Sequence, residues 1–433
     1  MTGRGGRRRV HAGDPIQRVA GRGARRAAAA LVLVLALAAG CTGDDAGEPT
    51  ATPTPTQSTT APTSGGDPGT LTETSDPATE STTPTPDATA RCVTELADGL
   101  TERAAIGQLL MVGVDSGGGV SSVEEAVTTY GVGGVIYLGG WTGRAVVAQA
   151  SREMRALADG PGLFIAADQE GGQVQQLRGT GFTDLPSATE QAAMGDAALA
   201  SAAIGWAQEL AGAGVNVNLA PVADTVPADI GTANGPIGQY HREYGATPNE
   251  VIPPMLAFLR GMQAGGVATT VKHFPGIGRI TGNTDSTAAG ITDDVATVRD
   301  ANLEPFSAGI LAGADFVMVS SARYPQIADE QALFAPEIVT DLLRERLGYA
   351  GVVITDDVGA AAAVADVPVG QRATRFLAAG GDIVLTARPG DVPVMSAAIA
   401  DLAATDADFA AAVDAALERV LTLKTRHGLT DCG

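Results

Sequence analysis

Aromatic residues are scarce in this 433-residue chain: Phe, Trp and Tyr together make up 4% of it. Proteins that bind single-stranded nucleic acid stack bases on exposed aromatic side chains set among basic residues, and this composition argues against such a platform. Hydrophobic residues nonetheless make up 45% of the chain, and Ala, Gly and Val dominate. This mixture suits helices packed tightly on a Val/Ile-rich parallel sheet. We therefore expect one large α/β domain.

Positive charge is also scarce. The chain has 28 Lys and Arg against 49 Asp and Glu, for a formal net charge of −21. Eight of the arginines and one aspartate lie within residues 1–40, so the remaining residues carry a net charge of −28. A surface this acidic repels phosphate backbones and anionic lipid headgroups. We expect no binding to nucleic acid.

The chain has only three cysteines, at positions 41, 92 and 432. No Cys/His cluster with metal-ligand spacing occurs, so we expect no metal and no organic cofactor. Cys92 and Cys432 lie at the two ends of the C-terminal part, and neither lies in an apolar run. In an oxidising compartment they would form a disulfide that ties the two ends together. The alternative is two unrelated buried thiols.

The first 40 residues have the composition of a targeting segment. An Arg-rich opening precedes the apolar residues 27–40, which are too few to span a bilayer but fit the apolar region of a signal sequence. The stretch ends in LALAAGC, which resembles a bacterial lipoprotein signal in which Cys41 is acylated; a plain secretory signal is the alternative. We expect an exported monomer held on the outer face of the cell membrane by this lipid anchor.

Residues 41–90 consist almost entirely of Thr, Pro, Ser, Ala, Gly and Asp, without a periodic apolar pattern. Such a composition predicts a disordered tether. The expected organisation is therefore a signal sequence at 1–40, a tether at 41–90 and a folded domain at 91–433.

Short apolar runs alternate with longer Ala/Leu-rich stretches eight times after Cys92. The runs are continuously apolar, as expected for strands that are buried on both faces. They occupy residues 109–114, 133–139, 163–169, 215–224, 268–274, 315–321, 351–357 and 382–387. This alternation predicts a single (β/α)8 TIM barrel. An open doubly wound sheet is the second choice, but no Gly-rich dinucleotide-binding turn follows the first run.

Several of the stretches between these runs have recognisable helix ends. Residues 247–250 (TPNE) have the Thr, Pro and Glu of a capping box, and Gly265 and Gly266 end that helix. Helices are also predicted over 335–347 and 374–379, each followed directly by glycine.

Polar residues gather where the predicted strands end. Because catalytic groups of such barrels lie at the C-terminal ends of the strands, these residues are the candidates for the site. They are Asp168, Glu170, Asp224, Lys272, His273, Asp356 and Asp357. Converging carboxylates with a Lys and a His nearby suit acid/base or nucleophilic chemistry on a polyhydroxylated substrate.

Five segments resemble those of the β-N-acetylhexosaminidases of glycoside hydrolase family 3. They are ADQEGGQVQQLRG (167–179), NLAPVAD (218–224), IGQYHREYG (237–245), KHFPGIG (272–278) and GVVITDD (351–357). The segments occur in the family's order and fall on the expected strands, which makes the resemblance specific.

The resemblance implies a role for each matched position. Asp356 would be the nucleophile that forms a glycosyl-enzyme, a step that suits a carboxylate. Asp168 would accept hydrogen bonds from sugar hydroxyls, and Arg242, Lys272 and His273 would donate to the sugar. The structural alternatives are a helix cap or ion pair for Asp356 and a mutually satisfied pair for Lys272 and His273. Asp357 would have a structural role.

The sequence departs from the family at the proton donor. The family's D-S-H, whose His is the acid/base and is held by the Asp, reads Asp285-Ser286-Thr287 here, and a Thr hydroxyl cannot replace imidazole near neutral pH. The carboxyl groups of Asp285 and Glu170 are the candidates to protonate the leaving group or support that step. His241 is a weaker candidate, better interpreted as a surface loop residue.

Three further family residues are replaced. An earlier loop His is Ile277, and two Arg of the strand-three segment are Gln173 and Gln176. Loss of these cations weakens the expectation that an anionic neighbouring sugar is recognised.

The resemblance implies a retaining exo-hydrolase that removes β-linked N-acetylglucosamine from cell-wall muropeptides or related glycans. Two alternatives remain open. One is a glycoside phosphorylase acting on the same linkage, and the other is a cell-surface glycan-binding lipoprotein without turnover, because the family's acid/base His is Thr287.

Overall fold

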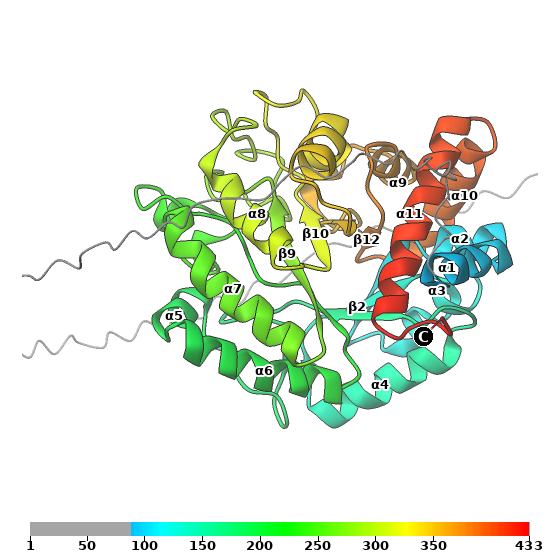
Figure 1. Cartoon of the computed structure of the whole chain (residues 1–433), viewed down its shortest axis with the longest axis horizontal. Coiled ribbons are helices and arrows are strands. Elements are labelled where there is room, and N and C mark those ends of the chain that lie inside the picture. The colour runs from blue at the N-terminus through cyan, green and yellow to red at the C-terminus, as the bar shows by residue number, and fades with distance from the viewer. Residues whose placement is uncertain (1–87, 433) are drawn as a thin grey trace, which may run out of the picture. The chain divides into compact units, whose positions relative to one another are not determined.

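A sheet of eight parallel strands forms the centre of the protein in the computed structural model, which describes residues 88–432 (Figure 1). The strands are β1 (Leu110–Asp115), β2 (Gly134–Leu138), β4 (Phe164–Ala167), β8 (Val217–Asn218), β9 (Ala268–Phe274), β10 (Phe316–Val319), β11 (Val352–Thr355) and β12 (Val384–Thr386). Except for the pair β1 and β12, neighbours in the sheet are successive barrel strands along the chain. The β1–β12 pairing and a parallel bridge between Ile354 and Ile383 close the sheet. The fold is therefore a (β/α)8 barrel and not a doubly wound sheet.

All eight predicted strand regions are confirmed, because continuous apolar runs are what a doubly covered sheet requires. Every residue of β9 is buried, including Lys272 and His273. Large side chains fill the interior; for example, the rings of Phe164 and Phe316 pack edge to face with centroids 5.3 Å apart.

Four short strands lie outside the barrel sheet. β5 (Gln169–Gly171) and β6 (Val174–Gln175) form an antiparallel hairpin, and β3 (Trp141–Thr142) pairs with β7 (Leu177–Arg178). Together they fix the segment that follows β4, at the end of the barrel where the polar strand-end residues lie.

Helices surround the barrel (Figure 1). They are α1 (Ala88–Gly99), α2 (Glu102–Gly107), α3 (Glu124–Thr128), α4 (Arg144–Leu157), α5 (Ala188–Ala193), α6 (Asp196–Gly212), α7 (Pro248–Ala264), α8 (Glu304–Leu311), α9 (Val369–Ala378), α10 (Val392–Ala403) and α11 (Ala407–Arg426), with a π-helix at Glu337–Arg346. Among the described residues, none of the helices is both long and apolar enough to cross a membrane.

The predicted helix ends agree with the structure to different degrees. α7 begins and ends as predicted, with the Thr247 backbone N–H donating to Glu250 Oε2 over 3.1 Å and Gly265 at the C-cap. The helix predicted over 335–347 forms within that range but as a π-helix. α9 begins five residues before the predicted 374, at Val369.

The two ends of the domain are joined. Cys92 in α1 and Cys432 after α11 form the predicted disulfide, with a Cα–Cα distance of 5.7 Å, and the two helices lie side by side (Figure 1). Residues 88–90 of the predicted tether belong to the first turn of α1. The predicted signal, Cys41 and the rest of the tether lie outside the described residues.

A lysine is buried at the N-terminal end of the barrel. Lys424 of α11 has no exposed surface, and its Nζ donates to Oε1 of Gln108 over 2.5 Å and lies 5.2 Å from the centre of the Phe164 ring. Burial lowers the pKa of this ammonium group to about 7, because the charged form loses its hydration.

Candidate active site

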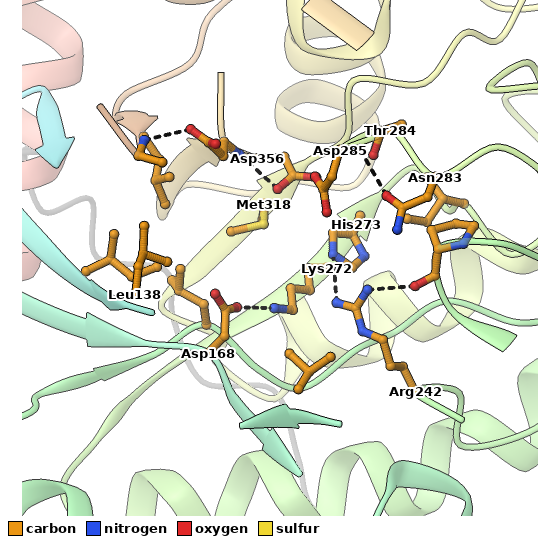
Figure 2. A pocket seen from close by; sticks show the side chains of 18 of the residues that line it. Leu138, Asp168, Arg242, Lys272, His273, Asn283, Thr284, Asp285, Met318 and Asp356 are labelled. Atoms are coloured by element: carbon orange, nitrogen blue, oxygen red, sulfur yellow. Dashed lines mark hydrogen bonds and ion pairs between the residues drawn. The ribbon is translucent and has the colours of Figure 1, made fainter. Parts of the chain in front are cut away.

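A pocket of about 270 Å³ opens at the C-terminal ends of the barrel strands (Figure 2). Polar side chains form part of its lining, and Leu138, Met318 and Leu385 contribute an apolar part. The volume lies slightly below the roughly 300–1,000 Å³ of typical small-molecule sites. It suits one sugar unit rather than a polymer chain.

Lys272 lies between two carboxylates on the pocket floor. Its Nζ is 2.5 Å from Oδ1 of Asp168, which follows β4, and 2.6 Å from Oε1 of Glu170 in β5. Burial alone would lower the pKa of Lys272, but the two carboxylates outweigh it and raise that pKa. The ammonium group is therefore charged and largely neutralised by the protein.

Arg242 binds the other side of Glu170. Its Nε and Nη2 donate to the two carboxylate oxygens over 2.8 and 2.7 Å, and its Nη1 donates to the Pro236 carbonyl over 2.8 Å. The loop that carries Arg242 is fixed by Asn234, whose side-chain amide donates to the carbonyls of Ile277 and Ile280. A bidentate pair of this kind sets the guanidinium plane as well as its position.

His273 is oriented by a buried carboxylate. Its Nδ1 lies 2.7 Å from Oδ2 of Asp224, which has no exposed surface, and Nε2 lies 3.4 Å from Nη2 of Arg242. This bonding pattern assigns the proton to Nδ1, directed at Asp224. Figure 2 shows Lys272, His273 and Arg242 gathered on one side of the pocket.

Glu170 is one of the two carboxyl groups that the sequence suggested as proton donors, but its surroundings do not suit this role. Burial raises its pKa, but Arg242 and Lys272 outweigh burial and hold the pKa at about 2. The carboxyl group is therefore ionised at any pH near neutrality, and its role is to hold the two cations in place.

Asp285 has the opposite electrostatic surroundings. It lies on the long loop between β9 and α8, and although much of the residue is exposed, its carboxyl group lines the pocket beside Asp356 (Figure 2). Burial raises its pKa, and the charges of Asp356 and Asp357 add to the increase, while Arg242 and His273 oppose it. The resulting pKa of about 6 lets this carboxyl group hold a proton close to neutral pH.

The backbone around Asp285 is anchored to the segment that follows β11 and Asp356. The carbonyls of Thr284 and Asp285 accept hydrogen bonds from the backbone N–H groups of Ala363 and Ala362 over 3.0 and 3.1 Å. These bonds connect the β9–α8 loop to the segment after β11, so that the two carboxyl groups are held together across some 70 residues of sequence.

The Asp pair after β11 divides into two roles. Asp357 accepts hydrogen bonds from the backbone N–H groups of Gly359, Ala360 and Ala387, as its predicted structural role requires. Asp356 lines the pocket and accepts only the N–H of Asp357 at one oxygen, over 2.9 Å. Its carboxylate is the one available for attack on a bound sugar.

Thr287 does not line the pocket, and its Oγ1 accepts the backbone N–H of Ala289 within a local turn. Ile277 does line the pocket, whereas Gln173 and His241 are exposed and outside its lining. Within residues 88–432, His273 is thus the pocket's only histidine, and it already binds Asp224.

The structure brings all the predicted site residues together: Asp168, Arg242, Lys272, His273, Asp285 and Asp356 line one pocket. Their individual roles remain predictions. Leu138 and Leu385 also line the pocket, but they carry no polar group, so the polar pattern at the strand ends gives no signal for them. Across residues 88–432, groups of three or more His, Cys, Asp or Glu side chains arranged to hold a metal are absent.

Comparison with known proteins agrees with this geometry. The model of the glycosyl hydrolase family 3 N-terminal domain matches residues 101–423. A β-hexosaminidase from Stenotrophomonas maltophilia is 38% identical over 264 residues, covering 59% of this chain and 76% of the relative.

Two solved structures are similar. The β-N-acetylhexosaminidase from Beutenbergia cavernae is 46% identical, with a TM-score of 0.73 over 75% of this chain and 99% of that one. A family 3 β-N-acetylglucosaminidase from Paenibacillus is 32% identical, with a TM-score of 0.67 over 76% of this chain and 63% of that one. By its matching domain and its relatives, this chain belongs to glycosyl hydrolase family 3.

Proposed function

We propose that this protein is a retaining β-N-acetylhexosaminidase that removes terminal β-linked N-acetylglucosamine. The observation that carries the proposal is the Asp356 carboxylate beside the Asp285 carboxyl group, in a pocket sized for one sugar. The β-hexosaminidases among its relatives support the same activity.

The two carboxyl groups divide the chemistry. The Asp356 carboxylate attacks the anomeric carbon while Asp285 gives its proton to the departing glycosidic oxygen, so that an ester between Asp356 and the sugar replaces the glycosidic bond. Asp285 then takes a proton from water, whose oxygen attacks the anomeric carbon and releases the sugar with its configuration retained. Each group ends in its starting protonation state.

The charged floor orients the sugar. Asp168 and Lys272 lie side by side in the lining, and their polar atoms can exchange part of the ion pair for hydrogen bonds to sugar hydroxyls. Because Lys272 is buried and Asp168 is partly buried, a substrate that lacks the matching hydroxyls would leave them poorly paired.

Water fits better than phosphate as the second nucleophile. The cations that line the pocket are Lys272 and Arg242, and both are bound to carboxylates. A phosphate ion would meet the Asp356 and Asp357 carboxylates without an uncommitted cation to stabilise it. We therefore favour the hydrolase over the phosphorylase.

Hydrolysis of an aryl β-N-acetylglucosaminide by the full chain tests the proposal, with and without phosphate. We expect free N-acetylglucosamine under both conditions. The Asp356→Asn variant should lose turnover but keep its affinity for the sugar, since only the bond to the anomeric carbon is removed. Sugar 1-phosphate would identify a phosphorylase, and sugar binding without turnover in the unmodified protein would identify a binding protein.

We also propose that the protein is an exported lipoprotein monomer anchored through Cys41. The apolar stretch before LALAAGC, and the Thr/Pro-rich residues that follow Cys41, support this location. Metabolic labelling with a fatty acid should mark the wild-type chain in the membrane fraction and not the Cys41→Ser variant. Label retained in that variant would contradict acylation at Cys41.

A further inference from the structure

The pocket holds more negative than positive charge. Asp168, Asp285, Asp356 and Asp357 line it together with only two permanent cations, Arg242 and Lys272. Two further carboxylates, from the buried residues Glu170 and Asp224, contact these cations or His273 directly. Even with Asp285 protonated, the carboxylates outnumber the cations.

Both cations are already paired with carboxylates of the protein. The three nitrogens of the Arg242 guanidinium are directed at Glu170 and the Pro236 carbonyl, and Lys272 Nζ lies within 2.6 Å of two carboxylate oxygens. Recruiting either cation to a ligand carboxylate would weaken one of the two ion pairs that neutralise the buried Glu170, and that exchange is unfavourable.

Gln176 contributes a neutral donor to the same lining. It follows the β5–β6 hairpin, and its backbone is fixed by hydrogen bonds to the Asp168 carbonyl over 3.1 Å and from the Trp141 N–H over 2.9 Å. The side-chain Oε1 accepts the N–H of Gly140 over 3.2 Å. The amide NH2 is therefore the end of this side chain that is left to contact a substrate, and it can bind a hydroxyl or carbonyl oxygen without supplying charge.

We propose that the site selects glycans in which the sugar next to the terminal N-acetylglucosamine is uncharged, and that Gln176 is a specificity-determining residue for this choice. The inference rests on the proposed hydrolase function. It narrows the expected substrates from muropeptides or related glycans to those without a carboxylate at this neighbouring sugar. A lactyl carboxylate there would meet like charge and would find an amide where an arginine could have paired with it.

Two disaccharides that differ only in charge provide the test. N-acetylglucosamine is β-linked either to a muramic-type sugar with a free lactyl carboxylate or to the same sugar with that group converted to the carboxamide, and kcat/KM is measured near neutral pH with the full chain. We expect the carboxamide to be cleaved at least about tenfold faster, with a gap that narrows as salt screens the charges.

A matched pair of variants locates the effect. Gln176→Arg should shift the ratio of the two kcat/KM values toward the carboxylate substrate by about tenfold, as expected for one new ion pair in a partly buried site. Gln173→Arg adds the same charge at an exposed position outside the lining and should leave the ratio unchanged.

Equal rates on the two disaccharides in the wild-type chain would overturn this inference alone. A shift of the ratio in Gln173→Arg as large as that in Gln176→Arg would also overturn it, because a general change in surface charge would then explain the effect. An aryl β-N-acetylglucosaminide serves as the activity control, and failure to cleave it would overturn the proposed function and this inference together.

Discussion

The pH dependence of the reaction should report the titration of Asp285. Burial, together with the negative charges of Asp356 and Asp357, raises the pKa of Asp285 to about 6, against the opposing effect of Arg242 and His273. A general acid works only in its protonated form, so kcat/KM should fall about tenfold per pH unit above this pKa. Two pH units above the pKa, about 1% of the maximal rate should remain.

Replacing the acid separates its role from the nucleophile's. Asp285→Asn keeps the size of the side chain but removes its titrating proton. The loss should be about 10²- to 10⁴-fold for substrates with poor leaving groups, the range typical of general acid catalysis. It should be much smaller for a dinitrophenyl glycoside, whose leaving group departs without a proton.

The assay is kcat/KM across pH for a series of aryl β-N-acetylglucosaminides, with the wild type and Asp285→Asn compared on each. In the variant the decline above pH 6 should disappear. If the variant keeps the same alkaline decline, or loses equal factors on good and poor leaving groups, another group supplies the proton and the assignment of Asp285 is wrong.

Three further predictions concern Thr287, where the sequence departs from the family, and two features of the scaffold, Lys424 and the disulfide. Thr287→His should give no more than about a twofold gain on poor leaving groups, because Thr287 lies outside the pocket lining and Asp285 already supplies the proton; a large gain in kcat/KM would contradict this. Lys424→Met should raise the melting temperature most below pH 7. The pKa of Lys424 is about 7 in the folded protein, against the ordinary value of 10.5, so protonation of this side chain opposes folding. Burying the protonated lysine costs about 5 kcal/mol of stability below pH 7, and this cost decreases as the pH rises toward 10.5. An equal increase in melting temperature at all pH values would therefore refute the burial argument. Replacing Cys92 and Cys432 by Ser should lower the free energy of unfolding by about 2–5 kcal/mol in denaturant titrations, since the cross-link closes most of the domain; unchanged stability would show that the bond contributes nothing.

The barrel could be predicted because each of its strands has a recognisable sequence pattern of its own. Runs such as 268–274 and 351–357 are apolar throughout, and a parallel strand covered on both faces requires that pattern. The helix ends were predictable only where local chemistry determines them. α7 has a capping box and a closing glycine pair, whereas the early start of α9 at Val369 has no strong cap in the sequence.

The site was predictable as a set of residues but not as a network. Strand ends and the family segments identify Asp168, Lys272 and Asp356, because both depend on order along the chain. Whether Glu170 or Asp285 holds the proton depends on which cations lie beside each carboxyl group. Those contacts form between distant segments, with Arg242 72 residues from Glu170, so the sequence alone left both candidates open.

The claim that Asp356 forms a covalent glycosyl-enzyme can be tested by trapping that species. A 5-fluoro N-acetylglucosaminyl fluoride slows both chemical steps, while its good leaving group keeps the first step the faster one, so that the intermediate accumulates. Mass spectrometry of the intact chain and of its proteolytic peptides should then find one added sugar, on Asp356. An adduct on a different residue, or release of product with inverted configuration and no adduct, would contradict the account.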